Sequence, residues 1–341
     1  MSAHELARTA GALVAPGKGI LAADESHPTI TKRFEALGIA GSEETRCAYR
    51  QMLFTTPGIG EFISGVILFD ETIRQKADDG VLFSAVLSRQ GIIPGIKVDR
   101  GAKALAGAPG EKVTEGLDGL RDRLGEYRGL GARFAKWRAV IAIGDGLPSA
   151  YCLDANAHAL GRYAALCQEA GLVPIVEPEV LLDGDHTLER CFEVTEATLH
   201  RVFRALGAQR VVLEHLLLKP SMVLPGKNCP RQAGVAEVAE ATVRCLLRAV
   251  PAAVPGIVFL SGGQSNESAT AHLNAMNRLE GPRPWQLSFS YARALQAPAM
   301  KAWGGQARNV PAGQRAFHHR AKCNSAARYG RYSPEMEGAA G

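Results

Sequence analysis

The sequence lacks the features that would place it in a membrane or mark it for secretion. None of its 341 residues belong to a run that approaches the roughly 18 consecutive apolar residues of a membrane span. The first residues, Met1-Ser-Ala-His-Glu, have no apolar core of the kind found in secretory signals. We therefore expect a cytoplasmic protein with no membrane partner.

Cysteine and histidine are also not spaced as in common metal or disulfide sites. The seven cysteines are odd in number, and no two of them are spaced as Cys-x-x-Cys. Reduced thiols in a cytosolic enzyme therefore fit better than a disulfide framework or a zinc knuckle. The nine histidines show no His-Glu-x-x-His spacing, and His318-His319 is their only adjacent pair. We expect neither a protein-bound metal nor a cofactor.

Acidic residues are missing from one long segment. Residues 281–334 contain nine lysines or arginines and no Asp or Glu, whereas the net charge of the whole chain is only +5. This segment is either a solvated basic face or a region that attracts anionic substrates. It contains no recognisable nucleic-acid module, so we do not expect nucleic-acid binding.

Short β-rich runs alternate with longer amphipathic stretches along the chain. Such alternation predicts a parallel sheet, and eight strands are the number that closes a (β/α)8 TIM barrel. An open doubly wound sheet is the alternative, but no strand is followed by Gly-x-Gly-x-x-Gly or by a P-loop motif. The expected strands are Lys18–Asp24, Phe62–Phe69, Ile93–Asp99, Arg133–Ile143, Leu172–Val180, Arg210–Lys219, Gly256–Gly262 and Pro284–Tyr291. Helices are expected at Ala157–Gly171, Asp185–Gly207 and Ala233–Val250.

The end of the chain has a different composition. Beyond about Gly304 it is rich in glycine, alanine and arginine and loses apolar periodicity. We therefore predict one barrel domain over residues 1–305 and a basic, partly mobile C-terminal extension over residues 306–341.

Charged residues stand where several predicted strands end. In a barrel, the carboxyl ends of the strands open into one crater, where the chemistry takes place. Side chains two apart on a strand share a face, so the strand ends deliver pairs of ionisable groups to that crater. The groups are Asp24, the pair Lys97 and Asp99, the pair Lys136 and Arg138, the pair Glu177 and Glu179, and Lys219.

Lys219 ends the apolar run Leu216-Leu-Leu-Lys-Pro220 and is the candidate nucleophile. Burial and a neighbouring cation such as Lys136 disfavour a charged ammonium group. A neutral amine can attack a ketone and form a Schiff base, whose protonated form lets a carbon–carbon bond break without a metal. A lysine that simply reaches solvent from a strand end is the alternative, so the assignment depends on the neighbours of Lys219.

Glu177 and Glu179 flank Pro178 and are candidate general acids or bases. Two carboxylates on one face repel each other, which predicts that one of them has a raised pKa. The alternative is that both carboxylates pair with the lysines, and one residue can do both.

Two loops have the composition of phosphate sites. Ser261-Gly262-Gly263 follows the seventh predicted strand, and Ser290 and Arg293 follow the eighth, where phosphates commonly bind in barrels. After the first strand, a helix begins in the segment that contains Ser26, Thr29, Lys32 and Arg33, which suits a second phosphate. The alternative is that Thr29 acts only as a helix cap.

Taken together, these segments resemble class I fructose-bisphosphate aldolase over roughly residues 5–332. The resemblance rests on Gly19-Ile-Leu-Ala-Ala-Asp-Glu-Ser26, Ile96-Lys-Val-Asp-Arg-Gly101, Phe134-Ala-Lys-Trp-Arg138, Val173-Pro-Ile-Val-Glu-Pro-Glu179, Leu217-Leu-Lys-Pro220, Leu260-Ser-Gly-Gly-Gln264, Phe289-Ser-Tyr-Ala-Arg-Ala-Leu-Gln296 and Ala299-Met-Lys-Ala-Trp-Gly-Gly305.

The resemblance implies a (β/α)8 barrel, usually a homotetramer, that reversibly cleaves fructose 1,6-bisphosphate into dihydroxyacetone phosphate and glyceraldehyde 3-phosphate. It implies that Lys219 carries the Schiff base and that Glu177 is the main proton acceptor and donor. Asp24, Lys136 and Glu179 are implied to assist. The implied C1-phosphate residues are Ser261, Gly262, Ser290 and Arg293, and the implied C6-phosphate residues are Ser26, Thr29, Arg33 and Lys97, with Arg138 nearby.

Three positions depart from the usual family pattern. His27-Pro28-Thr29 stands where the family usually has Thr-Gly-Ser, Ala292 replaces a glycine, and the final residues lack the tyrosine of vertebrate members. We expect working cleavage with altered proton-exchange kinetics. Two other functions stay open: a Schiff-base aldolase or transaldolase for another sugar phosphate, and a non-catalytic scaffold whose basic segment binds an acidic partner.

Overall fold

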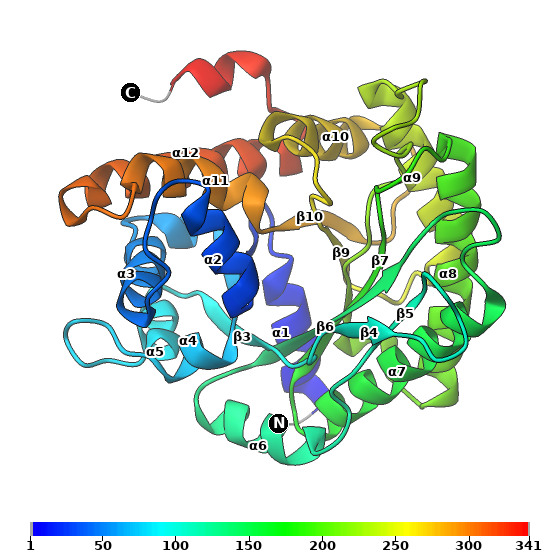
Figure 1. Cartoon of the computed structure of the whole chain (residues 1–341), viewed down its shortest axis with the longest axis horizontal. Helices are drawn as coiled ribbons and strands as arrows, with labels where there is room; N and C mark the ends of the chain where they lie inside the picture. The colour runs from blue at the N-terminus through cyan, green and yellow to red at the C-terminus, as the bar shows by residue number, and fades with distance from the viewer. Residues whose placement is uncertain (1–2, 340–341) are drawn as a thin grey trace.

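The computed structural model describes residues 3–339 and shows a barrel of eight parallel strands (Figure 1). Each strand pairs with its neighbour along the chain, and the last strand pairs with the first, which closes the sheet. The prediction of a (β/α)8 barrel is therefore confirmed. The strands are β1 (Gly19–Ala23), β2 (Ile63–Leu68), β3 (Ile93–Lys97), β6 (Phe134–Ile141), β7 (Val173–Val180), β8 (Leu217–Leu218), β9 (Gly256–Phe259) and β10 (Gln286–Tyr291).

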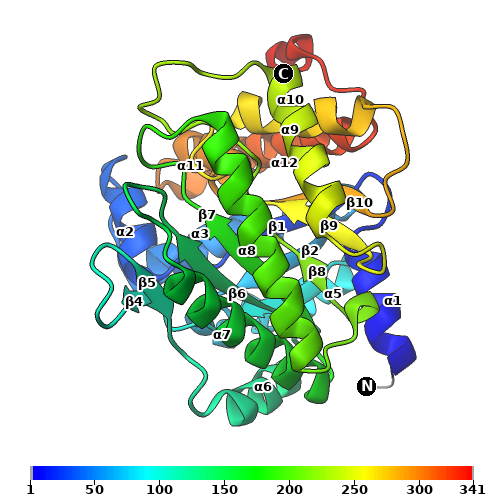
Figure 2. The ribbon, with the colours of Figure 1, turned by 90° about the vertical axis from the view of Figure 1, so that its right-hand side faces the viewer.

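Helices surround the barrel, because their apolar faces must be buried against the outside of the sheet. In Figure 2, α7, α8 and α9 stand side by side along one flank, and α7 also packs on β6 and β7. The helices are α1 (Ala3–Leu13), α2 (His27–Glu35), α3 (Glu43–Phe54), α4 (Asp70–Arg74), α5 (Phe83–Arg89), α6 (Leu120–Gly129), α7 (Ala150–Glu169), α8 (Leu188–Ala208), α9 (Val235–Ala249), α10 (Asn266–Arg278), α11 (Arg293–Trp303) and α12 (Val310–Arg328). Among the described helices, none is both long and apolar enough to cross a membrane.

Large side chains fill the barrel interior below the strand ends. The ring of Phe134 lies so close to Gly95 on β3 that a Cβ atom there would be 2.3 Å from it, so only glycine fits. Leu6 and Leu13 of α1 join Phe134 in an apolar cluster with Ile20, which buries the side chains of the lower barrel. This packing leaves the carboxyl ends of the strands as the open face.

One predicted strand is much shorter than expected. Of the run Arg210–Lys219, only Leu217–Leu218 pairs as β8. Arg210 has a left-handed φ of 58°, which is incompatible with an extended strand. The backbone of Val212 bonds to the side chain of Gln168 instead of to a neighbouring strand. The sequence reading was therefore wrong over residues 210–216, which contain the 3-10 turn η2 (Leu213–His215).

A small hairpin was not predicted. Strands β4 (Ala102–Ala104) and β5 (Lys112–Thr114) pair antiparallel in the connection between β3 and α6. Their three-residue length gives too little alternation to detect in the sequence. The other short turns are η1 (Ile59–Glu61) and η3 (Ala307–Asn309).

The C-terminal segment contains α12 and the turn η4 (Pro334–Ala339). Helix α12 packs against α3, α10 and α11, and Phe317, Ala321 and Cys323 on it belong to the main apolar cluster. The termini lie at opposite ends of the molecule in both ribbon views. The division into residues 1–305 and 306–341 and the mobility of the second part stay predictions.

Candidate functional site

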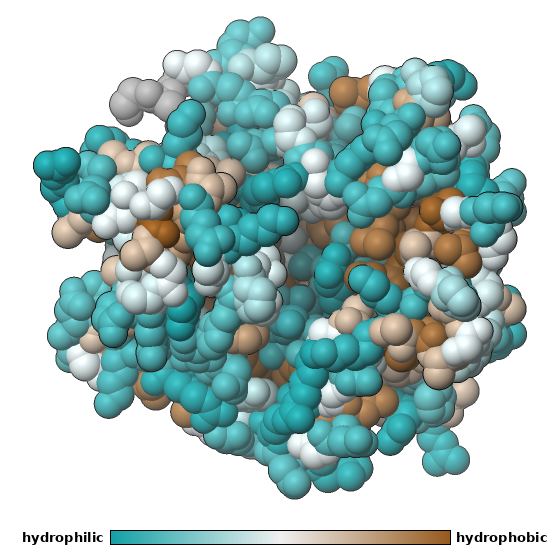
Figure 3. Space-filling model, viewed as in Figure 1, coloured by the Kyte–Doolittle hydropathy of each residue, from teal (hydrophilic) through white to brown (hydrophobic). Residues whose placement is uncertain are grey.

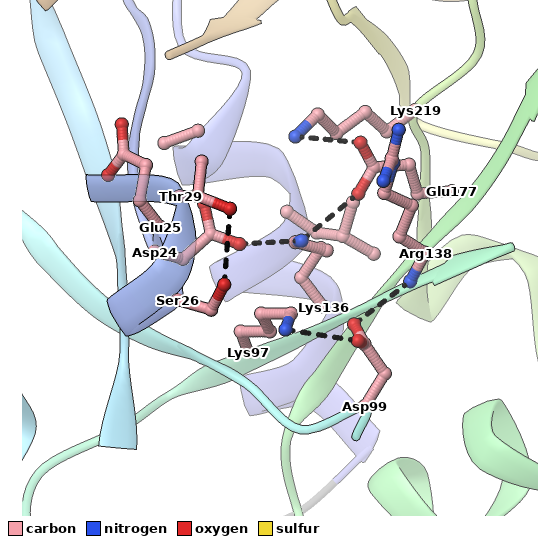
Figure 4. A network of polar contacts seen from close by, with 12 residues as sticks. Asp24, Glu25, Ser26, Thr29, Lys97, Asp99, Lys136, Arg138, Glu177 and Lys219 are labelled. Carbon is pink, nitrogen blue, oxygen red and sulfur yellow. Dashed lines mark hydrogen bonds and ion pairs between the residues drawn. The ribbon is translucent and has the colours of Figure 1, made fainter. Parts of the chain in front are cut away.

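The charged strand ends meet in one place, as Figure 4 shows. Asp24 follows β1, Lys97 ends β3, Lys136 lies on β6, Glu177 lies on β7 and Lys219 follows β8. Lys97 is the register partner of Lys136, and Arg138 that of Glu177, so neighbouring strands present these groups at similar depth. Closure of the barrel then brings Asp24 of the first strand within reach of Lys136 of the fourth.

Lys136 is the centre of the cluster. Its Nζ lies 2.5 Å from Asp24 Oδ2 and 3.3 Å from Glu177 Oε2, and all three side chains are buried. Burial acts to lower the pKa of Lys136, but the charges of Asp24 and Glu177 outweigh it and hold that pKa above its ordinary value. Burial likewise acts to raise the pKa of Asp24, and the lysines outweigh it and hold that pKa below its ordinary value.

Lys219 contacts the other oxygen of the same glutamate. Its Nζ lies 3.1 Å from Glu177 Oε1, and its backbone N–H donates to the carbonyl of Val176 at 2.8 Å. Only 3% of Lys219 is exposed to solvent, so its amine is held in place and largely dry. Glu177 thus lies between two lysines, within proton-transfer distance of both.

The prediction that Glu177 and Glu179 repel each other and that one pKa rises is wrong for Glu177. Burial acts to raise its pKa, but the charges of Lys136, Lys219 and Arg138 outweigh this effect and lower it. Glu179 is instead paired with Arg138 through a short contact to the Arg138 Nε. The alternative that the two carboxylates pair with cations is the one that the geometry supports.

The predicted pairing of Lys97 and Asp99 on one face is confirmed. Lys97 Nζ lies 3.2 Å from Asp99 Oδ1, and the other Asp99 oxygen accepts the backbone N–H of Arg138 at 3.3 Å (Figure 4). This contact ties the end of β3 to β6.

All fifteen predicted site residues line one open cleft with a volume of about 890 Å³. Figure 3 shows that the face viewed in Figure 1 is hollowed near its centre and that hydrophilic side chains surround much of the hollow. The set comprises Asp24, Ser26, Thr29, Arg33, Lys97, Lys136, Arg138, Glu177, Glu179, Lys219, Ser261, Gly262, Gly263, Ser290 and Arg293.

One end of the cleft is formed by the loops after β9 and β10. Gly262 and Gly263 have positive φ values of 57° and 97°, which favour glycine and turn the loop toward the cleft. The Ser290 hydroxyl is buried and has no hydrogen-bond partner among the described residues. Arg293 opens α11 and donates to the carbonyl of Gln264 at 3.2 Å. Ala292 before it has φ −98°, so this position does not need the left-handed backbone conformation that favours glycine.

The other end of the cleft is formed by the start of α2. Ser26 is the N-cap residue of α2, so Thr29 lies in the first turn, and their hydroxyl oxygens are 3.1 Å apart. Arg33 is paired with Glu25 at 2.5 Å, and Glu25 also pairs with Arg50 at 2.6 Å. Ser26, Thr29 and Lys97 line the same cleft, and the positive N-terminal end of α2 favours an anion there.

Sequence reasoning missed two functional candidates. Glu25 pairs with Arg33 and holds it in position. The place of Glu25 in its sequence motif does not reveal this partner. Lys227 lies beside the phosphate loop: a Cβ atom on Gly263 would be 3.3 Å from Lys227 Nζ and 3.7 Å from Arg293 Nη2. Lys227 is in a turn eight residues beyond Lys219, where no pattern distinguishes it from a surface lysine.

The donor set of the cleft suits proton transfer better than metal binding. Each of its buried carboxylates is paired with a lysine or arginine; these are Asp24, Glu25, Asp99, Glu177 and Glu179. A divalent cation would have to displace these charges, which gives the cleft no evident metal seat.

Comparisons with known proteins give one consistent result. A family model described as fructose-bisphosphate aldolase class-I matches residues 5–341. A probable fructose-bisphosphate aldolase class 1 of Xanthomonas campestris pv. campestris is 62% identical over 333 residues, covering 97% of this chain and 99% of that protein. The cytosolic fructose-bisphosphate aldolase 4 of Arabidopsis thaliana is 53% identical over 334 residues, covering 98% of this chain and 85% of that protein.

A solved structure is also closely similar. The fructose-bisphosphate aldolase of Plasmodium falciparum, in complex with TRAP and a small-molecule inhibitor, superposes with a TM-score of 0.95 and 50% sequence identity. The match covers 97% of this chain and 95% of that one.

Proposed function

Because this chain belongs to the class I fructose-bisphosphate aldolase family, we propose that Lys219 is the amine that forms the Schiff base with its substrate. The protein is a lyase that cleaves fructose 1,6-bisphosphate into dihydroxyacetone phosphate and glyceraldehyde 3-phosphate, a reaction of glycolysis and, in reverse, gluconeogenesis. The observation that carries the assignment of Lys219 is the buried chain of contacts from Lys219 through Glu177 and Lys136 to Asp24.

The first half of the reaction needs a nucleophile and an acid. The neutral amine of Lys219 attacks the C2 ketone, and the carbinolamine that results loses its hydroxyl group as water when a proton is supplied. Glu177 Oε1, 3.1 Å from Lys219 Nζ, is placed to take the proton from the amine and return it to the departing hydroxyl. The buried charge of Lys136, held by Asp24, stabilises the oxyanion that forms during attack.

The second half needs a base. When Glu177 removes the proton of the C4 hydroxyl, the C3–C4 bond electrons move into the iminium, and glyceraldehyde 3-phosphate leaves. The enamine left on Lys219 takes a proton at C3, and water then releases dihydroxyacetone phosphate and regenerates the amine. The charges of Glu179 and Arg138 offset each other in the ion pair that they form beside Glu177.

The two ends of the cleft are proposed to hold the two phosphates. The loop of Ser261, Gly262 and Gly263, with Ser290 and Arg293, would bind the C1 phosphate, and the unpartnered Ser290 hydroxyl supports this assignment. Lys227 would add a positive charge to this end. The C6 phosphate would lie toward the remaining group, which consists of Ser26, Thr29, Arg33, Lys97 and Arg138.

Reductive trapping tests the proposal. The protein is incubated with dihydroxyacetone phosphate, reduced with borohydride and mapped by peptide mass spectrometry. The expected adduct is on Lys219, is absent from Lys219→Ala, and is retained in Lys301→Ala, a matched change at an exposed lysine of α11. An adduct on another lysine, with Lys219 unmodified, would contradict the assignment.

We further propose that the enzyme is a homotetramer of the cytoplasm. Support comes from the family resemblance and from relatives that are named cytosolic, although one relative at 52% identity is named chloroplastic. Sedimentation equilibrium tests the assembly: a mass of about four times 36.3 kDa is expected, and a monomer mass at micromolar concentration would refute it.

A further inference from the structure

A histidine, a cysteine and a glutamate that do not line the cleft meet where the turn η4 packs on α12. His319 and Cys323 are four residues apart on α12 and so share a helix face, and Glu337 comes from the turn η4. His319 Nε2 lies 3.6 Å from Cys323 Sγ and 3.9 Å from Glu337 Oε2, and all three atoms lie within 4.8 Å of one another. In Figure 1 this turn is drawn in red and lies above α10 and α12.

We propose that His319, Cys323 and Glu337 form a binding site for a divalent transition metal of the zinc class, with water as the fourth ligand. The site is separate from the aldolase reaction, and nothing in the proposed catalytic mechanism depends on it. Imidazole, thiolate and carboxylate are the three protein ligand types that Zn²⁺ accepts in tetrahedral sites.

The spacing of the three atoms fits such an ion. Metal–ligand bonds of about 2.0–2.3 Å place tetrahedral ligands roughly 3.3–3.8 Å apart. The distance between the His319 nitrogen and the Cys323 sulfur is already within this range, and the distance from that nitrogen to the Glu337 oxygen is just above it. The third separation, between the Cys323 sulfur and the Glu337 carboxylate, is within 4.8 Å, so side-chain rotations must draw the three atoms together around an ion.

The carboxylate is already oriented by other groups. Glu337 Oε1 accepts the Tyr332 hydroxyl at 2.8 Å and a short hydrogen bond from Arg320, and this leaves Oε2 facing His319. Arg320 is itself buried and donates to the carbonyl of Asn266 at 3.1 Å and to Thr270 at 2.6 Å. Metal-ligating carboxylates in proteins commonly have such outer hydrogen-bond partners.

An ion at this site would bind the neutral imidazole of His319, the carboxylate of Glu337 and the thiolate of Cys323. Binding would therefore displace the thiol proton of Cys323, which is released to solvent.

The surrounding charges set the preference among ions. Arg320, Lys322 and the neighbouring His318 oppose a cation, while the thiolate and Glu337 together supply two negative charges. This balance favours ions that bind thiolate strongly and disfavours Ca²⁺ and Mg²⁺, which need several oxygen ligands. A bound ion would tie the turn η4 to α12.

The test uses the full-length protein, freed of metal with EDTA and then titrated with Co²⁺ and Zn²⁺ under reducing conditions. Cobalt bound to a thiolate gives a near-ultraviolet charge-transfer band, and calorimetry gives the Zn²⁺ stoichiometry and affinity. The variants are His319→Gln, Cys323→Ser and Glu337→Gln. The matched controls are His318→Gln, next to the site on the same helix, and Cys47→Ser on α3. Cleavage activity of each variant verifies that it is folded.

We expect one ion per chain in the unaltered protein and in both controls. Each of the three site variants should bind Zn²⁺ at least about tenfold more weakly, and Cys323→Ser should lose the cobalt band. The proposal is overturned if the unaltered protein binds no metal at micromolar concentration, or if Cys323→Ser keeps the band and the affinity. Unchanged affinity in both His319→Gln and Glu337→Gln would overturn it as well.

Discussion

Lys219 Nζ lies 3.1 Å from Glu177 Oε1, with both side chains buried at the mouth of the barrel. The other oxygen of this carboxylate lies 3.3 Å from Lys136 Nζ, so one glutamate serves two lysines of different strands. A proton can therefore pass between the amine and a single carboxylate without crossing solvent.

Replacing Lys219 with alanine should lower kcat for fructose 1,6-bisphosphate cleavage by at least about 10⁴-fold, because no other amine replaces a missing nucleophile. A coupled assay of triose phosphate production measures the loss. Lys301→Ala on the exposed face of α11 is the control and should stay within about twofold of the unaltered enzyme. Activity of Lys219→Ala above one-tenth of the unaltered value would rule out this residue as the nucleophile.

Replacing Glu177 with glutamine keeps the shape of the side chain but removes its proton-transfer ability. We expect kcat to fall by about 10²–10⁴-fold, while borohydride still traps dihydroxyacetone phosphate on Lys219, although more slowly. Glu193→Gln, on the exposed surface of α8, is the matched control. If Glu177→Gln retained full kcat, another group would have to be the main proton acceptor.

Two phosphate sites predict a preference for the bisphosphate. The value of kcat/KM for fructose 1,6-bisphosphate should exceed that for fructose 1-phosphate by at least about tenfold. Fructose 1-phosphate lacks the C6 phosphate and so cannot contact the cationic groups at that end of the cleft. Arg33→Ala should lower kcat/KM for the bisphosphate more than for fructose 1-phosphate, and this would reduce the ratio. Equal values for the two substrates in the unaltered enzyme would contradict the C6-phosphate assignment.

Lys227 is expected to contribute to binding more than to chemistry. Lys227→Ala should raise KM for fructose 1,6-bisphosphate several-fold and change kcat by less than about twofold, because the lost charge acts on ground state and transition state alike. Lys227→Arg should restore most of the affinity. The loss should shrink as the salt concentration rises, because Lys227 is half exposed. Lys227 Nζ also lies 3.0 Å from Asp183 Oδ1, and a KM equal to that of the unaltered enzyme would show that Lys227 serves only this ion pair.

Asp24 and Lys136 form a buried pair whose separation should be costly. Asp24→Ala leaves the charge of Lys136 with one partner fewer, and we expect the free energy of unfolding to fall by about 3–5 kcal/mol. The double variant Asp24→Leu with Lys136→Met removes both charges and should recover much of this stability while remaining inactive. Urea unfolding measures both, and equal stability of the Asp24→Ala and unaltered proteins would show that the pair does not stabilise the fold.

The same pair predicts the direction of a pH effect. The folded pKa of Asp24 lies below its ordinary value of about 3.9, so its stabilising contribution is complete above that pH and is lost as the pH falls below it. The unfolding midpoint in urea should therefore drop more steeply below about pH 4 in the unaltered protein than in Asp24→Asn. Parallel pH profiles for the two proteins would contradict this prediction.

Much of the site was predictable from the sequence because local chemistry determines it. Apolar runs that end on charged residues predict the strands and the open face, and the Gly-Gly loop after the seventh strand predicts an anion site. The motif segments identify the family over nearly the whole chain. All of the residues predicted for the site line the same cleft, since parallel strands of a closed barrel must end on one side.

The partners of each charged group depended on tertiary structure. Strand periodicity places Glu177 and Glu179 on one face, but barrel closure determines that Glu177 meets Lys136 and Lys219 while Glu179 meets Arg138. The pKa of Glu177 is therefore lowered by cations and not raised by its neighbouring carboxylate. Lys227 lies beside Gly263, and Glu337 meets His319 and Cys323, across separations along the chain that follow no regular pattern; only His319 and Cys323 have helical spacing. Such contacts depend on how loops and helices pack, and packing is a property of the whole chain rather than of any local pattern.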